Sequence, residues 1–241
     1  MKFVRHSPSS LNLFCASPAM FVVEKIIGLR QQVGAPAHRG TAIEDGVAAG
    51  LFDPQASVEH CVDVALKKYD TITALSSDAR RADYRKTIPA MVETALGELR
   101  PYGIPSRTQG FVEWKPDDLQ YPIVGYFDFE WAQHGIIVDL KTTEKLPSQI
   151  KIPHARQVAL YALSDNIDAR LTYATPKKIA TYRLENIREH RNALHAIARN
   201  CEAFLALSDE PKDFLKFTAP DLESFYWGGP NRQLAFEHWG I

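Results

Sequence analysis

The order of hydrophobic and polar positions divides the chain into a helical first part and a strand-rich second part. In residues 7–29, Ser and Pro capping signals precede apolar residues at helical spacing, which predicts one helix there. Three more helices are expected, over residues 38–52 (entered through Gly40), over Val58–Leu75 and over Ala79–Leu99. A stretch rich in proline and glycine, residues 100–106, then ends the helical part.

The pattern after residue 107 is typical of an α/β core. Strands are expected over residues 108–115, 121–131, 134–143, 169–176 and 178–186, and helices over residues 154–163 and 187–207. Residues 132–135 have the length of a hairpin loop, and the aromatic tail, residues 208–241, is weakly periodic. We predict a single domain, residues 1–241, made of a helical N-terminal region (1–100), an α/β core (107–207) and a tail packed on that core.

Two acidic residues and a lysine interrupt the apolar pattern of two neighbouring strands. Asp139 and Lys141 are two residues apart, so both side chains point to one face of their strand, while Val138 and Leu140 point to the other. A short hairpin brings Asp128 beside Asp139, and two converging carboxylates repel each other unless a cation neutralises them. Oxygen ligands suit Mg²⁺ or Mn²⁺, and a nearby lysine stabilises the charge that grows on a phosphate under attack. The alternative, a surface hairpin with solvated charges, fits poorly with so apolar a second strand.

Composition narrows the class of protein without naming a function. The chain is 45% hydrophobic with a net charge of -1, which argues against a histone-like DNA binder that is basic over its whole surface. Residues 141–199 nevertheless carry 11 Lys and Arg against 5 Asp and Glu, which predicts one basic face. Three cysteines without a CxxC pair indicate small buried residues rather than a zinc site or disulfides. No apolar run approaches a membrane span, so we expect a cytoplasmic protein, in the host cytoplasm if a phage encodes it.

Asp128 followed by "VDLKTT", which contains Asp139, Leu140 and Lys141, resembles the PD-(D/E)XK nuclease superfamily, and most closely its RecB-like and phage-exonuclease branch. Gln157 and Tyr161 match the QxxxY arrangement that this family carries after the lysine strand. "HRGTAIEDG" resembles the family's helical first motif and places Glu44 at its acidic position. Each motif is weak alone, but their order and context are together fairly specific, over about Ser7 to Tyr161. The resemblance implies an α/β fold of the restriction-endonuclease type, a central mixed sheet flanked by helices.

The resemblance also implies roles for individual residues. Asp128 and Asp139 would bind the metal, Leu140 would add its backbone carbonyl, and Glu44 would sit in or next to the ligand set. Lys141 would position or activate the attacking water. Gln157 and Tyr161 would contact the DNA backbone or brace the site, and the expected DNA-binding residues are Arg39, Thr142, Thr143, Lys145 and Arg156.

Further basic residues are weaker candidates for the same groove. Lys151 and His154 flank the QxxxY helix, whereas Lys177 and Lys178 are expected in a solvated turn. The tail aromatics Phe225, Tyr226 and Trp227 are favoured as core residues over base-stacking ones. Cys15 matches the first cysteine of iron–sulfur members, but only one cysteine follows the core, so no iron–sulfur cluster is expected.

Together these features predict a Mg²⁺-dependent deoxyribonuclease, with Mn²⁺ as a substitute, and favour an exonuclease of phage or mobile-element recombination. Its substrate would be duplex ends or single strands, and the resemblance implies a single-strand annealing protein as a partner. A homo-oligomer stays open, because the sequence does not give the oligomeric state. Two alternatives stay open: an endonuclease of the same superfamily, and a catalytically silent DNA-binding protein with this fold. No phosphate-binding loop of the GxxxxGK[ST] type and no GxSxG elbow occurs, so neither a motor nor a serine hydrolase is supported.

Overall fold

The computed structural model describes residues 3–29, 33–164 and 166–241 of the chain. Its chain forms two compact units, one of residues Met1–Gln31, Glu113–Gly125 and Arg188–Ile241, the other of Gln32–Val112 and Tyr126–Ile187. The prediction of a single domain stays a prediction, and the units are described one at a time. The predicted α/β class, a mixed sheet with flanking helices and a helical N-terminal region, is confirmed.

Five strands form one sheet in the order β1-β2-β3-β4-β5. They are β1 (Arg107–Trp114), β2 (Ile123–Trp131), β3 (Ile136–Thr142), β4 (Asp168–Ala174) and β5 (Ile179–Arg183). β3 pairs antiparallel with β2 and parallel with β4, and β4 pairs antiparallel with β5. The central position of β3 explains its apolar sequence, because a strand paired on both sides and covered on both faces excludes water.

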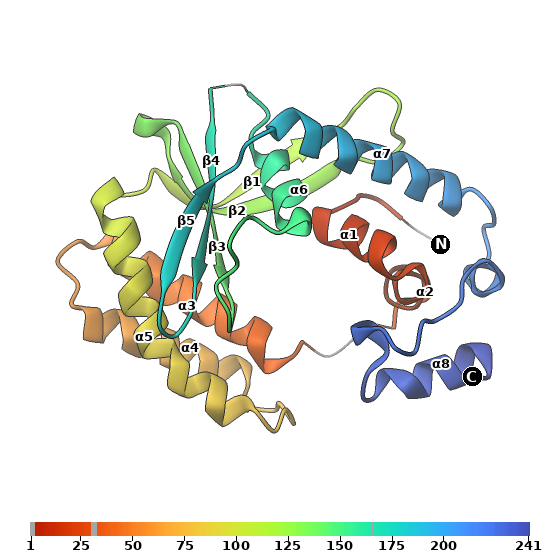
Figure 1. Ribbon diagram of the computed structural model, residues 1–241, viewed down its shortest axis with the longest axis horizontal. Coiled ribbons are helices and arrows are strands. Elements are labelled where there is room, and N and C mark those ends of the chain that lie inside the picture. The colour runs from red at the N-terminus through yellow and green to blue at the C-terminus, as the bar shows by residue number, and fades with distance from the viewer. Residues whose placement is uncertain (1–2, 30–32, 165) are drawn as a thin grey trace. The chain divides into compact units, whose positions relative to one another are not determined.

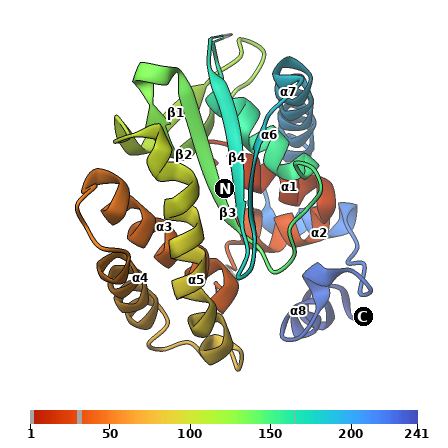
Figure 2. The same ribbon diagram turned by 60° about the vertical axis from the view of Figure 1, so that its left-hand side comes forward.

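Three helices of the second unit cover one side of this sheet. α3 (Ala35–Phe52), α4 (Val58–Ile72) and α5 (Arg81–Leu99) lie together beside β3, β4 and β5 (Figure 1). Their apolar faces pack on Phe129 and Trp131 of β2 and on Val138 and Leu140 of β3. α6 (Ile152–Tyr161) lies on the opposite side of the sheet from α5 (Figure 2). Asp139 and Lys141, which alternate with the core residues of β3, therefore face the α6 side.

The first unit is built from the remaining helices. It contains α1 (Pro8–Ala16), α2 (Pro18–Phe21), a π-helix (Val22–Ile27), α7 (Ile187–Leu205), which enters it at Arg188, and α8 (Asn231–Trp239). Short 3₁₀ helices, Pro211–Phe217 and Phe225–Trp227, precede α8. A hydrogen bond between the buried His6 Nε2 and Glu202 Oε1, at 3.1 Å, joins the start of the chain to α7 within this unit.

Several predicted elements differ in detail from the structure. The helix expected over residues 7–29 is broken at Ser17, whose side chain caps α2, and it ends as a π-helix. The helix expected from residue 38 begins at Ala35, so Gly40 lies inside α3 rather than at its entry. The loop of residues 132–135 contains a 3₁₀ turn, Ala132–His134.

The buried status of two side chains was predicted wrongly. Trp227 of the tail is buried and donates its indole N–H to Ser17 Oγ at 3.2 Å, but Phe225 is 92% exposed. Cys61 and Cys201 are buried as expected, whereas Cys15 is exposed.

Among the described helices, none is both long and apolar enough to cross a membrane.

Candidate nuclease site

All of the candidate site residues belong to the second unit, and β2 and β3 bring the first two acids together. The ladder between these strands ends at Phe129 paired with Val138, and the same register places Asp128 opposite Asp139. Beyond that pair the backbone amide of Leu140 donates to Asp128 Oδ2 at 2.7 Å. A side-chain carboxylate thus replaces the carbonyl of a neighbouring strand, and this bond fixes Asp128 beside β3.

Lys141 and Gln157 hold the second acid. Asp139 is 1% exposed, and its Oδ2 pairs with the ammonium of Lys141. Its Oδ1 accepts from Gln157 Nε2 at 3.4 Å, and the same amide donates to Tyr161 Oη at 2.8 Å. Gln157 and Tyr161 lie one turn apart on α6, so hydrogen bonds link Tyr161 through Gln157 to Asp139.

Glu44 reaches the site from α3 through a residue that the sequence analysis missed. Gln109 of β1 donates from Nε2 to Glu44 Oε1, and to Asp128 Oδ1 at 3.3 Å. Its φ angle is +50°, a left-handed backbone that glutamine rarely adopts. An ordinary polar position in a strand gives no sequence signal for such a bridge, because the bridge depends on contacts across 65 and 19 residues.

The charges at this site are unbalanced. Burial raises the pKa of Asp128 well above its usual value, and repulsion from Asp139 and Glu44 adds to the increase. Burial and then repulsion from Asp139 raise the pKa of Glu44 in the same way. Burial alone would lower the pKa of Lys141, but attraction to Asp139 and Asp128 outweighs it, so the pKa rises and the lysine stays charged. Three carboxylates thus share one ammonium.

These carboxylates fit a divalent cation by their chemistry. They are hard oxygen donors with excess negative charge, and in the described chain the ammonium of Lys141 is the cation that pairs with the buried Oδ2 of Asp139. As they stand, no three His, Cys, Asp or Glu side chains of the described residues are arranged to hold one metal ion. Instead, Gln109 bridges Glu44 and Asp128, and Lys141 pairs with Asp139, so ligation requires these two side chains to move.

The structure also locates the expected DNA-binding residues. Arg39 is 2% exposed, and its Nη1 contacts Glu144 Oε1 at 2.6 Å and Thr87 Oγ1 at 3.1 Å. Its guanidinium also lies over the ring of Tyr84, at 4.8 Å from the ring centroid. Because Arg39 is buried, we favour a role in anchoring the loop that begins at residue 143. Direct contact of Arg39 with DNA stays a prediction.

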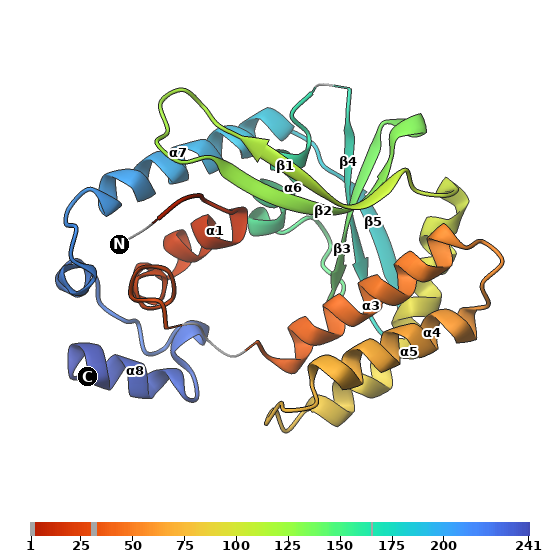
Figure 3. The ribbon, with the colours of Figure 1, turned by 180° about the vertical axis from the view of Figure 1, so that it is seen from behind.

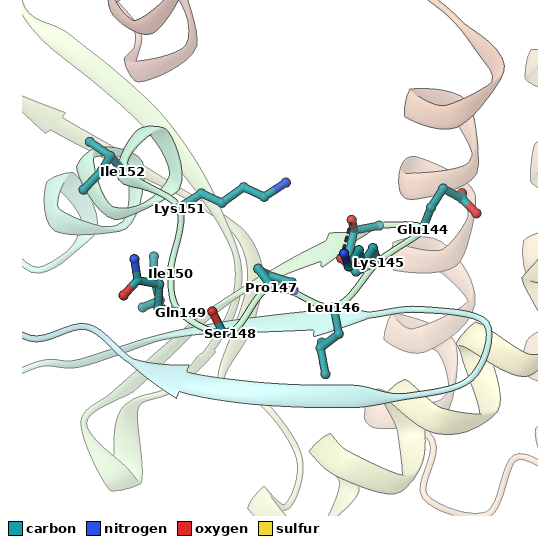
Figure 4. A pocket seen from close by; sticks show the side chains of 10 residues that line it. Glu144, Lys145, Leu146, Pro147, Ser148, Gln149, Ile150, Lys151 and Ile152 are labelled. Atoms are coloured by element: carbon teal, nitrogen blue, oxygen red, sulfur yellow. Dashed lines mark hydrogen bonds between the residues drawn. The ribbon is translucent and has the colours of Figure 1, made fainter.

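The other expected DNA contacts follow β3 and α6. Thr142 is the last residue of β3 and lies close to Gly40 of α3. Helix α3 runs past this end of the strand (Figure 3). Thr143 and Lys145 lie in the loop between β3 and α6, where the residues of 143–152 line a hollow of about 680 Å³ (Figure 4). Arg156 is half-buried on α6.

Comparison with known proteins identifies the family of the chain. The family model of the PD-(D/E)XK nuclease superfamily matches residues 5–220. No curated protein matches the chain. Among solved structures, one titled "Crystal structure of SSO0001" is similar over 74% of this chain and 91% of that chain, with 17% sequence identity and a TM-score of 0.34.

Proposed function

Because the chain belongs to the PD-(D/E)XK nuclease superfamily, we propose that it is a divalent-metal-dependent deoxyribonuclease that acts from DNA ends. The observation that carries the proposal is the convergence of Asp128, Asp139 and Glu44 around one charged lysine in the second unit. Buried acids that repel each other destabilise a sheet, and such an arrangement is typical of a functional site.

Glu44, Asp128, Asp139 and the carbonyl of Leu140 would hold the metal ion. When bound, the ion would neutralise phosphate charge and make a water molecule more acidic. The raised pKa of Lys141 keeps its ammonium charged, so this residue would stabilise developing negative charge rather than act as a base. Gln157, itself bonded to Tyr161, would keep Asp139 oriented during the reaction.

The distribution of basic residues supports a nucleic acid as the substrate. Lys145 and Lys151 line the hollow next to β3, and attraction between lysines and backbone phosphates does not depend on sequence. Processing of DNA ends in phage or mobile-element recombination is the setting that we propose. Its support is the resemblance to the phage-exonuclease branch.

The test is incubation of purified protein with linear and with closed circular duplex DNA, in Mg²⁺, in Mn²⁺ or in EDTA. We expect loss of the linear DNA alone, only with a metal ion, and no cleavage by Asp139→Asn. Cleavage of both forms would identify an endonuclease. Binding without cleavage in either metal would identify a silent DNA-binding protein.

A further inference from the structure

A histidine on α6 lies beside the proposed site without a role in it so far. His154 is the third residue of α6, and its Nδ1 lies 2.7 Å from the hydroxyl of Tyr173. Tyr173 is fully buried on β4 and pairs with Lys141 in the parallel register of β3 and β4. The imidazole is therefore placed on the same side of the sheet as Lys141.

The hydrogen bonds of Tyr173 determine which nitrogen of His154 carries the proton. The backbone N–H of Lys151 donates to Tyr173 Oη at 3.2 Å, so this oxygen already accepts one hydrogen bond. Burial raises the pKa of Tyr173, so its hydroxyl keeps its proton. That proton finds its acceptor in His154 Nδ1, and the opposite assignment would leave the buried hydroxyl proton without an acceptor in the described chain. His154 therefore carries its own proton on Nε2.

The surrounding charges keep this imidazole neutral. Burial lowers the pKa of His154 to about 4, and the ammonium groups of Lys141 and Lys151 contribute to the decrease against the opposing effect of Asp139. A neutral imidazole with Nδ1 engaged and a proton on Nε2 is a hydrogen-bond donor there. It is neither a base nor a metal ligand, because both functions require a free lone pair.

Lys151 adds a positive charge next to this donor. Figure 4 shows its side chain extending from the α6 end of the loop of residues 143–152 toward the side where Glu144 and Lys145 lie. We propose that His154 and Lys151 form a subsite for a backbone phosphate of the nucleic-acid substrate, with His154 donating from Nε2. This subsite rests on the proposed nuclease function, and its ligand is a phosphodiester, whose oxygens only accept hydrogen bonds.

The first test reads the tautomer directly. ¹⁵N NMR of the imidazole at pH 7, with the His154 signals assigned by their absence in His154→Gln, should show a neutral ring protonated at Nε2. Tyr173→Phe should convert this single form into a mixture of tautomers. A ring protonated at Nδ1, or on both nitrogens, would overturn the proposal.

The second test measures DNA affinity in Ca²⁺, without turnover. His154→Ala and Lys151→Ala should each weaken binding by roughly tenfold, the scale of a hydrogen bond to a charged group. His154→Gln places an N–H near the position of Nε2 and should stay within about threefold of the wild type, whereas His154→Asn should resemble His154→Ala. Lys177→Ala, on the turn between β4 and β5, is the matched control and should bind normally.

A third measurement separates phosphate contact from structural support. Oligonucleotides that carry one uncharged methylphosphonate at successive positions should include a position at which wild type and His154→Ala bind equally. If the difference persists at every position, His154 does not contact a phosphate and the proposal fails. None of these three measurements requires cleavage. If the protein bound DNA without cutting it, the proposed nuclease function would be refuted, but the phosphate subsite could still be tested.

Discussion

At the scale of single residues, Lys141 has the most specific expected effect. Its ammonium pairs with Asp139 and stays charged because of the surrounding acids. We expect Lys141→Ala to lower the cleavage rate at saturating DNA by about 100-fold or more, the scale of one lost electrostatic stabiliser. DNA affinity in Ca²⁺ should change little, because the lysine provides one contact among many.

Arg156→Ala is the comparison for that experiment. It should weaken binding and make its salt dependence shallower, while the rate at saturating DNA stays near normal. The reverse pattern for Lys141→Ala, lost affinity with normal turnover, would make Lys141 a groove residue and contradict its catalytic assignment.

Asp128 should limit the stability of the metal-free protein. Its pKa is raised above the unfolded value, so the protonated form stabilises the fold and that contribution is lost as the pH rises through the folded pKa. At pH 8, Asp128→Asn should therefore have a free energy of unfolding about 1 kcal/mol higher than that of the wild type. It should unfold at a correspondingly higher urea concentration. The difference should shrink toward pH 4, and urea titrations in EDTA across this range measure it. If the wild type and Asp128→Asn were equally stable at pH 8, Asp128 would not be repelled by the neighbouring acids.

The sequence predicts the part of this site that depends on short-range geometry. The strand period and the short hairpin were sufficient to bring Asp128, Asp139 and Lys141 together, and helical spacing was sufficient to join Gln157 to Tyr161. Gln109 and Tyr173 were missed, because their partners come from other elements and their residue types are ordinary in strands. The functional roles of all these residues stay predictions.

At the scale of elements, α3 and α4 pack so closely that one contact admits no side chain. A Cβ on Gly46 of α3 would lie 2.6 Å from the carbonyl oxygen of Cys61 and 2.8 Å from Ala65 Cβ. Gly46→Ala should therefore destabilise the protein by about 1–3 kcal/mol, since backbone has to move to make room. Thermal unfolding measures the change.

Gly97→Ala on α5 is the matched control, because nothing lies within 4 Å of its added Cβ. It should stabilise the protein by about 0.5–1 kcal/mol, as alanine is the better helix former. If both substitutions changed the stability equally, the close packing of α3 on α4 would not depend on a glycine at position 46.

Most element types could be predicted from the period of apolar residues, and the errors lie at their ends. The apolar spacing of residues 7–29 continues through Ser17, but a capping hydroxyl followed by Pro18 starts a new helix there. In α3, Pro36 sits in the first turn, so the helix begins before the motif that suggested it. Local capping and proline positions thus overrode a continuous pattern.

At the scale of the whole molecule, the excess negative charge should couple metal binding to folding. Mn²⁺ at about 100 times its dissociation constant should add about 2.7 kcal/mol to the free energy of unfolding, or roughly 5–10 °C in Tm. The effect should be larger at pH 8 than at pH 6, because the raised pKa values of Asp128 and Glu44 make protons compete with the ion as pH falls. Differential scanning calorimetry with and without Mn²⁺ tests this.

Asp139→Asn should show little or no stabilisation by Mn²⁺ in the same calorimetry. The charge-matched control is Asp45→Asn on α3, which also removes one negative charge. The Asp45 carboxylate pairs with Lys68, so this substitution should leave the Mn²⁺ effect intact. Equal stabilisation of wild type and Asp139→Asn would place the ion elsewhere.

The hydrogen bond from Leu140 to Asp128 has a consequence for hydrogen–deuterium exchange. The middle strand of a sheet is ordinarily the last to exchange its amide protons, because they are released only when the sheet opens. One proton of β3 is held instead by a carboxylate oxygen. Its exchange should therefore depend on what competes for that oxygen, so the Leu140 amide should report ligation of Asp128 from the central strand of the sheet.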